Sequence, residues 1–208
     1  MNKYLEKLNK SIQSFDGTVL EQYASEYDVP IIEYESLMVL KLLIRTNKVK
    51  RILEIGTAIG YSSLHMASIN EDIQIDTIER NEEMYNLAIN NIKEANMEKQ
   101  INVHFADALK IDLSELKEQY DMIFIDAAKA QSGKFFNRFS PLLNKDGIIV
   151  TDNILFHGCV ESQEGLTKNV LNMVKKIDAY NHHLATLNDY DTIYISTGDG
   201  LAVTTRKK

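Results

Sequence analysis

The sequence lacks the features that mark secreted and membrane-spanning chains. Its single cysteine, Cys159, excludes an internal disulfide framework and permits a reducing compartment. No apolar run approaches the ~20 residues that a membrane span needs, and no signal-peptide hydrophobic region is recognisable. Linkers, low-complexity segments and internal repeats are also missing. We therefore expect one domain over residues 1–208, in the cytoplasm and away from membranes.

The composition is that of an ordinary soluble globular protein. Hydrophobic residues make up 44% and charged residues 25% of the 208 positions, which suits one sizeable core. The formal net charge of −7 counts against broad nucleic-acid binding, because a phosphate backbone attracts an excess of basic side chains. A local basic patch remains compatible with that total.

The stretch over residues 51–67 organises the rest of the chain. An apolar run over Ile52–Ile55 predicts a buried strand, Gly56 and Gly60 bracket a tight turn, and helical periodicity follows. The glycines let the backbone approach a ligand, to which the helix N-terminus presents free N–H groups. Glu79, at the end of the next predicted strand, lies 23 positions after Gly56, close to the offset at which an acid binds ribose hydroxyls. This pattern predicts a ribose-containing cofactor.

The spacing of the glycines helps to distinguish between cofactors. A dinucleotide fingerprint needs a middle glycine that lets pyrophosphate approach, and Ala58 occupies that place here. Glu54 adds a negative charge at the strand end, which suits a cationic ligand better than a pyrophosphate. S-adenosylmethionine carries an ammonium and a sulfonium and no phosphate. The stretch resembles motif I of the class I methyltransferases; a generic strand–turn–helix unit with structural glycines is the alternative interpretation.

Strands and helices alternate regularly after this unit. Further strands are predicted over residues 73–78, 101–105, 121–126 and 147–152, and helices over residues 82–96, 113–117, 134–139 and 166–180. Two last strands, over residues 192–196 and 201–205, flank a hairpin turn at residues 197–200. We expect a doubly wound α/β sheet of seven strands, mostly parallel with an antiparallel C-terminal hairpin, as in the Rossmann-like class I methyltransferases.

The segment before the first strand is predicted to be a helical cap over residues 1–46, followed by an α/β core over residues 51–208. Leu5, Leu8 and Ile12 share one helical stripe, and further stripes follow up to residue 44. Residues 29–32 should be extended, because the residue before Pro30 avoids the α region. Such a cap can close over a cofactor, although helices that only pack against the rest of the domain are an equal alternative.

Acidic and amide side chains follow five consecutive predicted strands, at the edge where ligands bind in doubly wound sheets. The sharpest group is Asp126, Asp152 and Asn153, which offers two carboxylates and an amide carbonyl. Oxygen ligands of this kind suit a hard ion, Mg²⁺ above all. The alternative is that these residues cap turns and the following helix. Lys129, three residues after Asp126, is either a base acting on the same substrate or a solvated lysine at a helix start.

These motifs together resemble the metal-dependent O-methyltransferases of the catechol and caffeoyl-CoA type, over nearly the whole chain. The resemblance implies that Asp126, Asp152 and Asn153 bind Mg²⁺ and that Lys129 is the base, with Asp126 serving cofactor and metal alike. The further cofactor contacts that it implies are the Ser62 side chain to the carboxylate, Glu79 to the ribose, Asp107 to the adenosine end and the Ile32 main chain to the methionine moiety. Glu54 and Gly56 belong to the same predicted cofactor site.

The sequence is most similar to one bacterial branch, the tRNA 5-hydroxyuridine methyltransferases. The likeness is carried by the segments at 51–62, 124–129, 134–136 and 198–202, while Ala130-Gln131 departs conservatively from the Gly-Gln of that branch. It implies Mg²⁺-dependent methyl transfer from S-adenosylmethionine to the 5-hydroxyl of wobble 5-hydroxyuridine in the tRNA anticodon loop, giving 5-methoxyuridine, in a homodimer.

Three other functions are open to the sequence: O-methylation of a small catechol or phenol, nicotinamide-dependent oxidation, and cofactor binding without catalysis. Ala58 counts against the second, and retention of the metal ligands and Lys129 counts against the third. If tRNA is the substrate, a local basic patch must bind its phosphates. The candidate residues are Arg45, Lys48, Lys50 and Arg51 before the first strand and Arg206, Lys207 and Lys208 at the tail, each of which is also explained as ordinary solvated charge.

Overall fold

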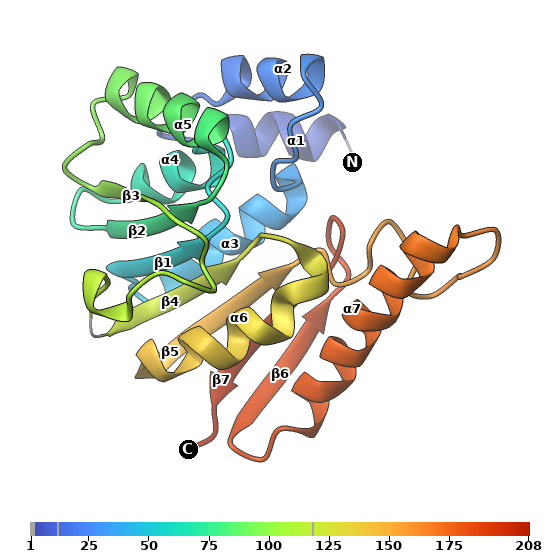
Figure 1. The fold of residues 1–208 in the computed structure, drawn as a ribbon. Coiled ribbons are helices and arrows are strands. Elements are labelled where there is room, and N and C mark those ends of the chain that lie inside the picture. The colour runs from blue at the N-terminus through green and yellow to red at the C-terminus, as the bar shows by residue number, and fades with distance from the viewer. Residues whose placement is uncertain (1–2, 12, 118) are drawn as a thin grey trace.

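The protein is built on one seven-stranded mixed sheet with the strand order β3-β2-β1-β4-β5-β7-β6 (Figure 1). The computed structural model describes residues 3–11, 13–117 and 119–208. The strands are β1 (Arg51–Ile55), β2 (Gln74–Glu79), β3 (Ile101–Phe105), β4 (Tyr120–Ile125), β5 (Leu143–Asp152), β6 (Tyr190–Ile195) and β7 (Leu201–Arg206). The first five pair in parallel, and β7 pairs antiparallel with both β5 and β6. This is the predicted class I methyltransferase architecture.

Helices cover both faces of the sheet (Figure 1). They are α1 (Lys3–Lys10), α2 (Thr18–Glu26), α3 (Tyr34–Thr46), α4 (Tyr61–Ala67), α5 (Glu82–Glu94), α6 (Ser132–Phe139) and α7 (Lys168–Thr186), with 3₁₀ turns at Leu113–Glu115, Lys129–Gln131 and Ser140–Leu142. One apolar core lies between the sheet and α3, α4 and α5, and a second lies between the sheet and α6 and α7. Within the described residues, no helix is long and apolar enough to cross a bilayer.

The N-terminal segment forms three helices, as the apolar stripes predict, but they contribute unequally to the core. Leu37, Leu40 and Ile44 of α3 are fully buried, whereas Leu5 and Leu8 of α1 are 53% and 48% exposed. Ile12, which shares their predicted stripe, lies outside the described residues. The segment over residues 29–32 is neither helix nor strand, and it crosses the end of the sheet where the cavity described below opens.

The C-terminal hairpin returns the chain to the edge at which the parallel strands end. Because β7 runs antiparallel to β5, with Asp152 opposite Leu201, the turn over residues 197–200 lies beside the end of β5. α7 runs six residues beyond its predicted end because Leu184 is buried in the second core. Its N-cap is Thr167, whose hydroxyl accepts from the Val170 N–H.

Candidate active site

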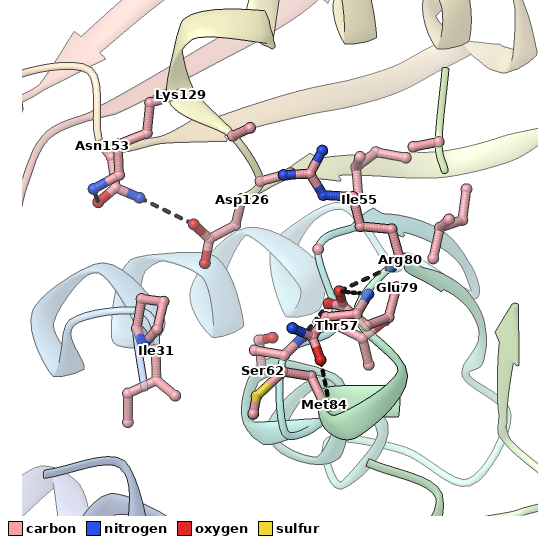
Figure 2. Close-up of a pocket in the computed structure, with 18 of the residues that line it drawn as sticks. Ile31, Ile55, Thr57, Ser62, Glu79, Arg80, Met84, Asp126, Lys129 and Asn153 are labelled. Carbon is pink, nitrogen blue, oxygen red and sulfur yellow. Dashed lines mark hydrogen bonds between the residues drawn. The ribbon is translucent and has the colours of Figure 1, made fainter. Parts of the chain in front are cut away.

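A cavity of about 710 Å³ opens at the carboxyl ends of the parallel strands. Its walls come from the N-terminal segment and from the loops after β1, β2, β3, β4 and β5, mainly at residues 27–32, 55–58, 61–62, 78–81, 106–108, 126–129, 153 and 156. Figure 2 shows Asp126 and Asn153 on one side of this space and Glu79 on the other. Ile32, Gly56, Ser62, Glu79, Asp107 and Asp126, all predicted to contact the cofactor, line the cavity.

Gly56 brings the ends of β1 and β4 together beneath the cavity. Its φ of +103° lies in a region that L side chains rarely adopt, and a methyl group there would lie 2.8 Å from the carbonyl carbon of Asp126 and closer still to its oxygen. The backbone is held by hydrogen bonds from Gly56 N–H to the Ile78 carbonyl at 3.1 Å and from Asp126 N–H to the Ile55 carbonyl at 3.0 Å. The glycine therefore permits a contact between two backbones that any side chain would prevent.

Glu79 organises the turn at the other end of the cavity. Its carboxylate accepts three backbone N–H groups, from Ala58 at 2.9 Å and from Arg80 and Asn81 at 2.8 Å each (Figure 2). A carboxylate offers about four acceptor positions, so acceptor capacity remains for a ligand. Glu79 thus links the β1–α4 turn, where Ala58 has a φ of +45°, to the end of β2.

Glu54 does not line the cavity, contrary to the prediction that it contacts the cofactor. Successive side chains of a strand point to opposite faces, and that of Glu54 points toward α4. Its buried carboxylate accepts hydrogen bonds from the hydroxyls of Ser62 at 2.5 Å, Thr77 at 2.6 Å and Ser63. Burial outweighs these bonds and raises the pKa of Glu54 to about 7. Its contribution to the site is to orient Ser62, which does line the cavity.

Asp126, Asn153 and Lys129 form one hydrogen-bonded group. The Asn153 amide donates to Asp126 Oδ1 at 3.0 Å, and its Oδ1 accepts from Lys129 Nζ at 2.6 Å. Asn153 has a φ of +63°, which turns its side chain toward β4. Asp152 is buried next to this group but does not line the cavity; its Oδ1 accepts the Asn153 N–H at 2.7 Å.

The two aspartates carry unfavourable negative charge at low dielectric. Burial raises the pKa of Asp126 to about 6. Burial, and then the nearby Asp126 carboxylate, raise the pKa of Asp152 to about 8. In residues 3–11, 13–117 and 119–208, no three carboxylate, imidazole or thiol side chains converge as a metal site. The predicted metal ligands are two carboxylates and an amide, and their oxygen chemistry and mutual repulsion both suit a hard divalent cation.

Comparison with known proteins places this arrangement in a family. The sequence matches the family model described as O-methyltransferase over residues 8–207. The chain belongs to this O-methyltransferase family. The methyltransferase fold and the elements that carry the cavity are therefore shared with enzymes that methylate oxygen atoms.

Individual relatives support the same assignment. The O-methyltransferase is 31% identical to caffeoyl-CoA O-methyltransferase of Stellaria longipes over 172 residues, which is 78% of this chain and 70% of the relative. A Staphylococcus aureus protein assigned as a caffeoyl-CoA O-methyltransferase superposes with a TM-score of 0.93 at 44% identity, over 99% of this chain and 98% of that one. The O-methyltransferase TomG of Streptomyces achromogenes, solved in complex with S-adenosylmethionine, gives 0.82 at 25% identity, over 100% and 97%.

One residue that sequence reasoning missed is Asp199, which the O-methyltransferase buries beside Lys129. Asp199 lies in the turn between β6 and β7, and its Oδ2 is 3.7 Å from Lys129 Nζ. The sequence Thr197-Gly-Asp-Gly200 predicts only a turn. The sequence feature that could have placed Asp199 near the cavity was the predicted antiparallel hairpin. Because β7 runs antiparallel to both β5 and β6, β6 points the same way as β5, and the turn after β6 lies at the edge where β1 to β5 end.

The basic residues proposed to bind phosphate lie at the opposite edge of the sheet. Residues 45–51 lead up to and include the first residue of β1, and residues 206–208 comprise the last residue of the antiparallel β7 and the two that follow it. The five residues of β1, at ~3.3 Å each, separate this edge from the cavity by about 16 Å. Lys50 is also paired with Asp72 and Lys207 with Asp191. These side chains do not surround the mouth of the cavity, and their binding of tRNA phosphates stays a prediction.

Proposed function

We propose that this O-methyltransferase binds S-adenosylmethionine in the cavity and transfers its methyl group to a substrate hydroxyl held near Asp126, Lys129 and Asn153. The observation that carries the proposal is the polarity of the cavity, with the Glu79 carboxylate at one end and the Asp126 group at the other. Glu79 suits ribose hydroxyls, and Gly56 leaves backbone space for a ligand. The bound S-adenosylmethionine of TomG supports the same cofactor in this family.

The ligand chemistry of Asp126, Asp152 and Asn153 fits a Mg²⁺ ion. All three side chains offer oxygen atoms, and two of them are carboxylates; burial, and then the proximity of Asp126, raise the pKa of Asp152. When bound, such an ion supplies positive charge that orients a substrate oxygen and lowers the pKa of its hydroxyl. Lys129 lies within hydrogen-bonding distance of Asn153 and is the basic side chain available in this group to receive or stabilise the hydroxyl proton.

The substrate that we propose is wobble 5-hydroxyuridine in the anticodon loop of tRNA, with 5-methoxyuridine as product. Its support is the likeness of the motifs at 51–62 and 124–129 to that branch, together with chemistry. The O4 carbonyl and the 5-hydroxyl of this base lie on adjacent carbons and present two oxygens, as a catechol does. An unstacked loop base can enter a cavity that a paired base cannot reach.

A small catechol or phenol is the second candidate, and two observations favour it. The relatives include caffeoyl-CoA O-methyltransferases, and the proposed basic patch lies away from the cavity. The two candidates share every catalytic residue, so only a substrate comparison separates them.

The deciding experiment is mass spectrometry of tRNA nucleosides from cells lacking the protein. Loss of 5-methoxyuridine with accumulation of 5-hydroxyuridine supports the tRNA substrate, and complementation by the Lys129→Ala variant should fail. In parallel, purified enzyme is offered hydroxyuridine-containing tRNA and free catechols under identical conditions. Methylation of catechols with tRNA inert would sink the tRNA proposal and establish the second candidate.

A further inference from the structure

Asp199 joins the C-terminal hairpin to the loop that follows β5. Its side chain is 3% exposed, and its Oδ1 accepts the backbone N–H of His157. Its own carbonyl accepts the N–H of Leu155 at 2.9 Å, and the Gly200 carbonyl accepts that of Ile154 at 3.3 Å. The loop carries positive φ values at Asn153, Phe156 and His157, a conformation that side chains adopt only when the surroundings enforce it. The hydrogen bonds from Asp199 and Gly200 of the hairpin turn hold the loop in this conformation.

The second carboxylate oxygen of Asp199 faces Lys129. Oδ2 is buried and, within the part of the chain that the structure describes, accepts no hydrogen bond. It lies 3.7 Å from Lys129 Nζ and 3.9 Å from Nδ1 of the 67% exposed His157 ring. Water screens the exposed imidazole, whereas the Lys129 side chain is only 23% exposed. A buried carboxylate without a hydrogen bond depends on a nearby positive charge for its stability, and Lys129 supplies it.

Lys129 is thereby held from several sides. Its Nζ donates to Asn153 Oδ1 at 2.6 Å, lies 3.7 Å from Asp199 Oδ2, and stands 5.2 Å from the centre of the Phe156 ring. Asn153 and Phe156 belong to the loop that Asp199 anchors through His157. The Asp199 carboxylate therefore contacts Lys129 with one oxygen and, with the other, anchors the loop that carries Asn153 and Phe156.

We propose that Asp199 is a positioning residue for methyl transfer, which acts through Lys129 by holding its amine against the Asn153 amide. The inference rests on the proposed function in that it takes Lys129 to participate in the transfer. Asp199 itself does not line the cavity, so it has no direct contact with substrate or cofactor.

Two substitutions separate the anchoring of the loop from the positioning of Lys129. Asp199→Asn keeps the shape and an acceptor oxygen for the His157 N–H but removes the charge that faces Lys129. Asp199→Ala removes both. The matched control is Asp121→Asn, because Asp121 accepts the N–H groups of Lys50 and Arg51 at 2.9 Å each, at the opposite edge of the sheet.

We expect Asp199→Asn to lower kcat about tenfold, with the KM for S-adenosylmethionine within about twofold of wild type. Asp121→Asn should leave kcat unchanged. In a Lys129→Ala background, Asp199→Asn should have no further effect on kcat, because its target is gone. Asp199→Glu should recover part of the lost rate, since it restores the charge. A wild-type kcat in Asp199→Asn, or an equal loss in the Lys129→Ala background, overturns the proposal.

A second measurement needs no substrate. Acylation of lysines by a small amine reagent, followed by peptide mass spectrometry, compares Lys129 with the exposed Lys134 in the same digest. Asp199→Asn should raise the relative labelling of Lys129 several-fold, and Asp121→Asn should not. If wild-type enzyme methylates neither tRNA nor catechols, the proposed function fails while this labelling still tests the contact. Unchanged labelling of Lys129 in Asp199→Asn refutes its positioning by Asp199.

Discussion

Replacing Gly56 with alanine should disrupt the site and the sheet together. The added methyl group would meet the carbonyl of Asp126, which is backbone and cannot rotate away. Relief requires the end of β1 to shift away from β4, which strains its hydrogen bonds to both neighbours, from Asp126 N–H to Ile55 at 3.0 Å and from Gly56 N–H to Ile78 of β2 at 3.1 Å, worth ~1 kcal/mol each. The positive φ adds ~1–2 kcal/mol, and overpacking adds ~1–3 kcal/mol. The sum is a loss of roughly 4 kcal/mol or more in the free energy of unfolding.

The matched control for this substitution is Gly165→Ala. Gly165 also has a positive φ, +75°, but a methyl group there meets nothing within 4 Å. The Gly165→Ala variant should therefore lose only ~1 kcal/mol in its free energy of unfolding, which lowers Tm by about 2–4 °C in a domain of this size. Gly56→Ala should lower Tm by about 10 °C or more and abolish binding of S-adenosylmethionine in calorimetry. Equal Tm shifts for the two variants in thermal unfolding would refute the proposed backbone contact.

Four further changes test the site. Glu79→Gln should weaken S-adenosylmethionine binding about tenfold, because the charge on the ribose acceptor is lost; unchanged calorimetry would exclude that contact. Burial raises the pKa of Glu54 from 4.5 to about 7, so its effect on stability is most favourable below pH 4.5 and declines by ~3 kcal/mol as pH rises to 7. Glu54→Gln should lack this decline in denaturant titrations at the two pH values, and an identical decline would contradict the assignment. Asp152→Ala, like excess chelator, should abolish turnover yet preserve cofactor affinity, and full activity in chelator counts against Mg²⁺. Lys129→Ala should lower kcat on the order of 10²-fold, and a pH–rate profile superimposable on wild type argues against a base.

The sequence predicted the sheet well because its strands carry two independent signals. Buried parallel strands are continuous apolar runs, and each run here is followed by glycine or by acidic and amide residues. Predicted helix ends differ from the observed ones where burial of a later residue extends the helix. The polar residues Asn181, His182 and His183 look like a helix end. α7 nevertheless continues past Tyr180, because Leu184 is buried in the core.

The site was predicted less completely because side-chain direction is a property of three dimensions. Glu54 and Gly56 both follow from the motif, but the alternation of β1 sends the Glu54 carboxylate beneath the cavity, toward Ser62 and Ser63. Asp199 was overlooked because it lies 70 positions from Lys129 along the chain. Only the strand order, which inserts β7 next to β5, brings the two residues together.

The insertion of β7 between β5 and β6 also bears on synthesis of the protein. Domains begin to fold while the ribosome is still extending the chain. β6 is made before β7 but has no partner in the sheet until residues 201–206 arrive. The nascent chain therefore presents the unpaired edge of β5, a template for association with other chains, for as long as those residues are missing. The same delay postpones the hairpin turn beside the end of β5, so a partly synthesised chain has a nearly complete sheet but an unfinished candidate active site.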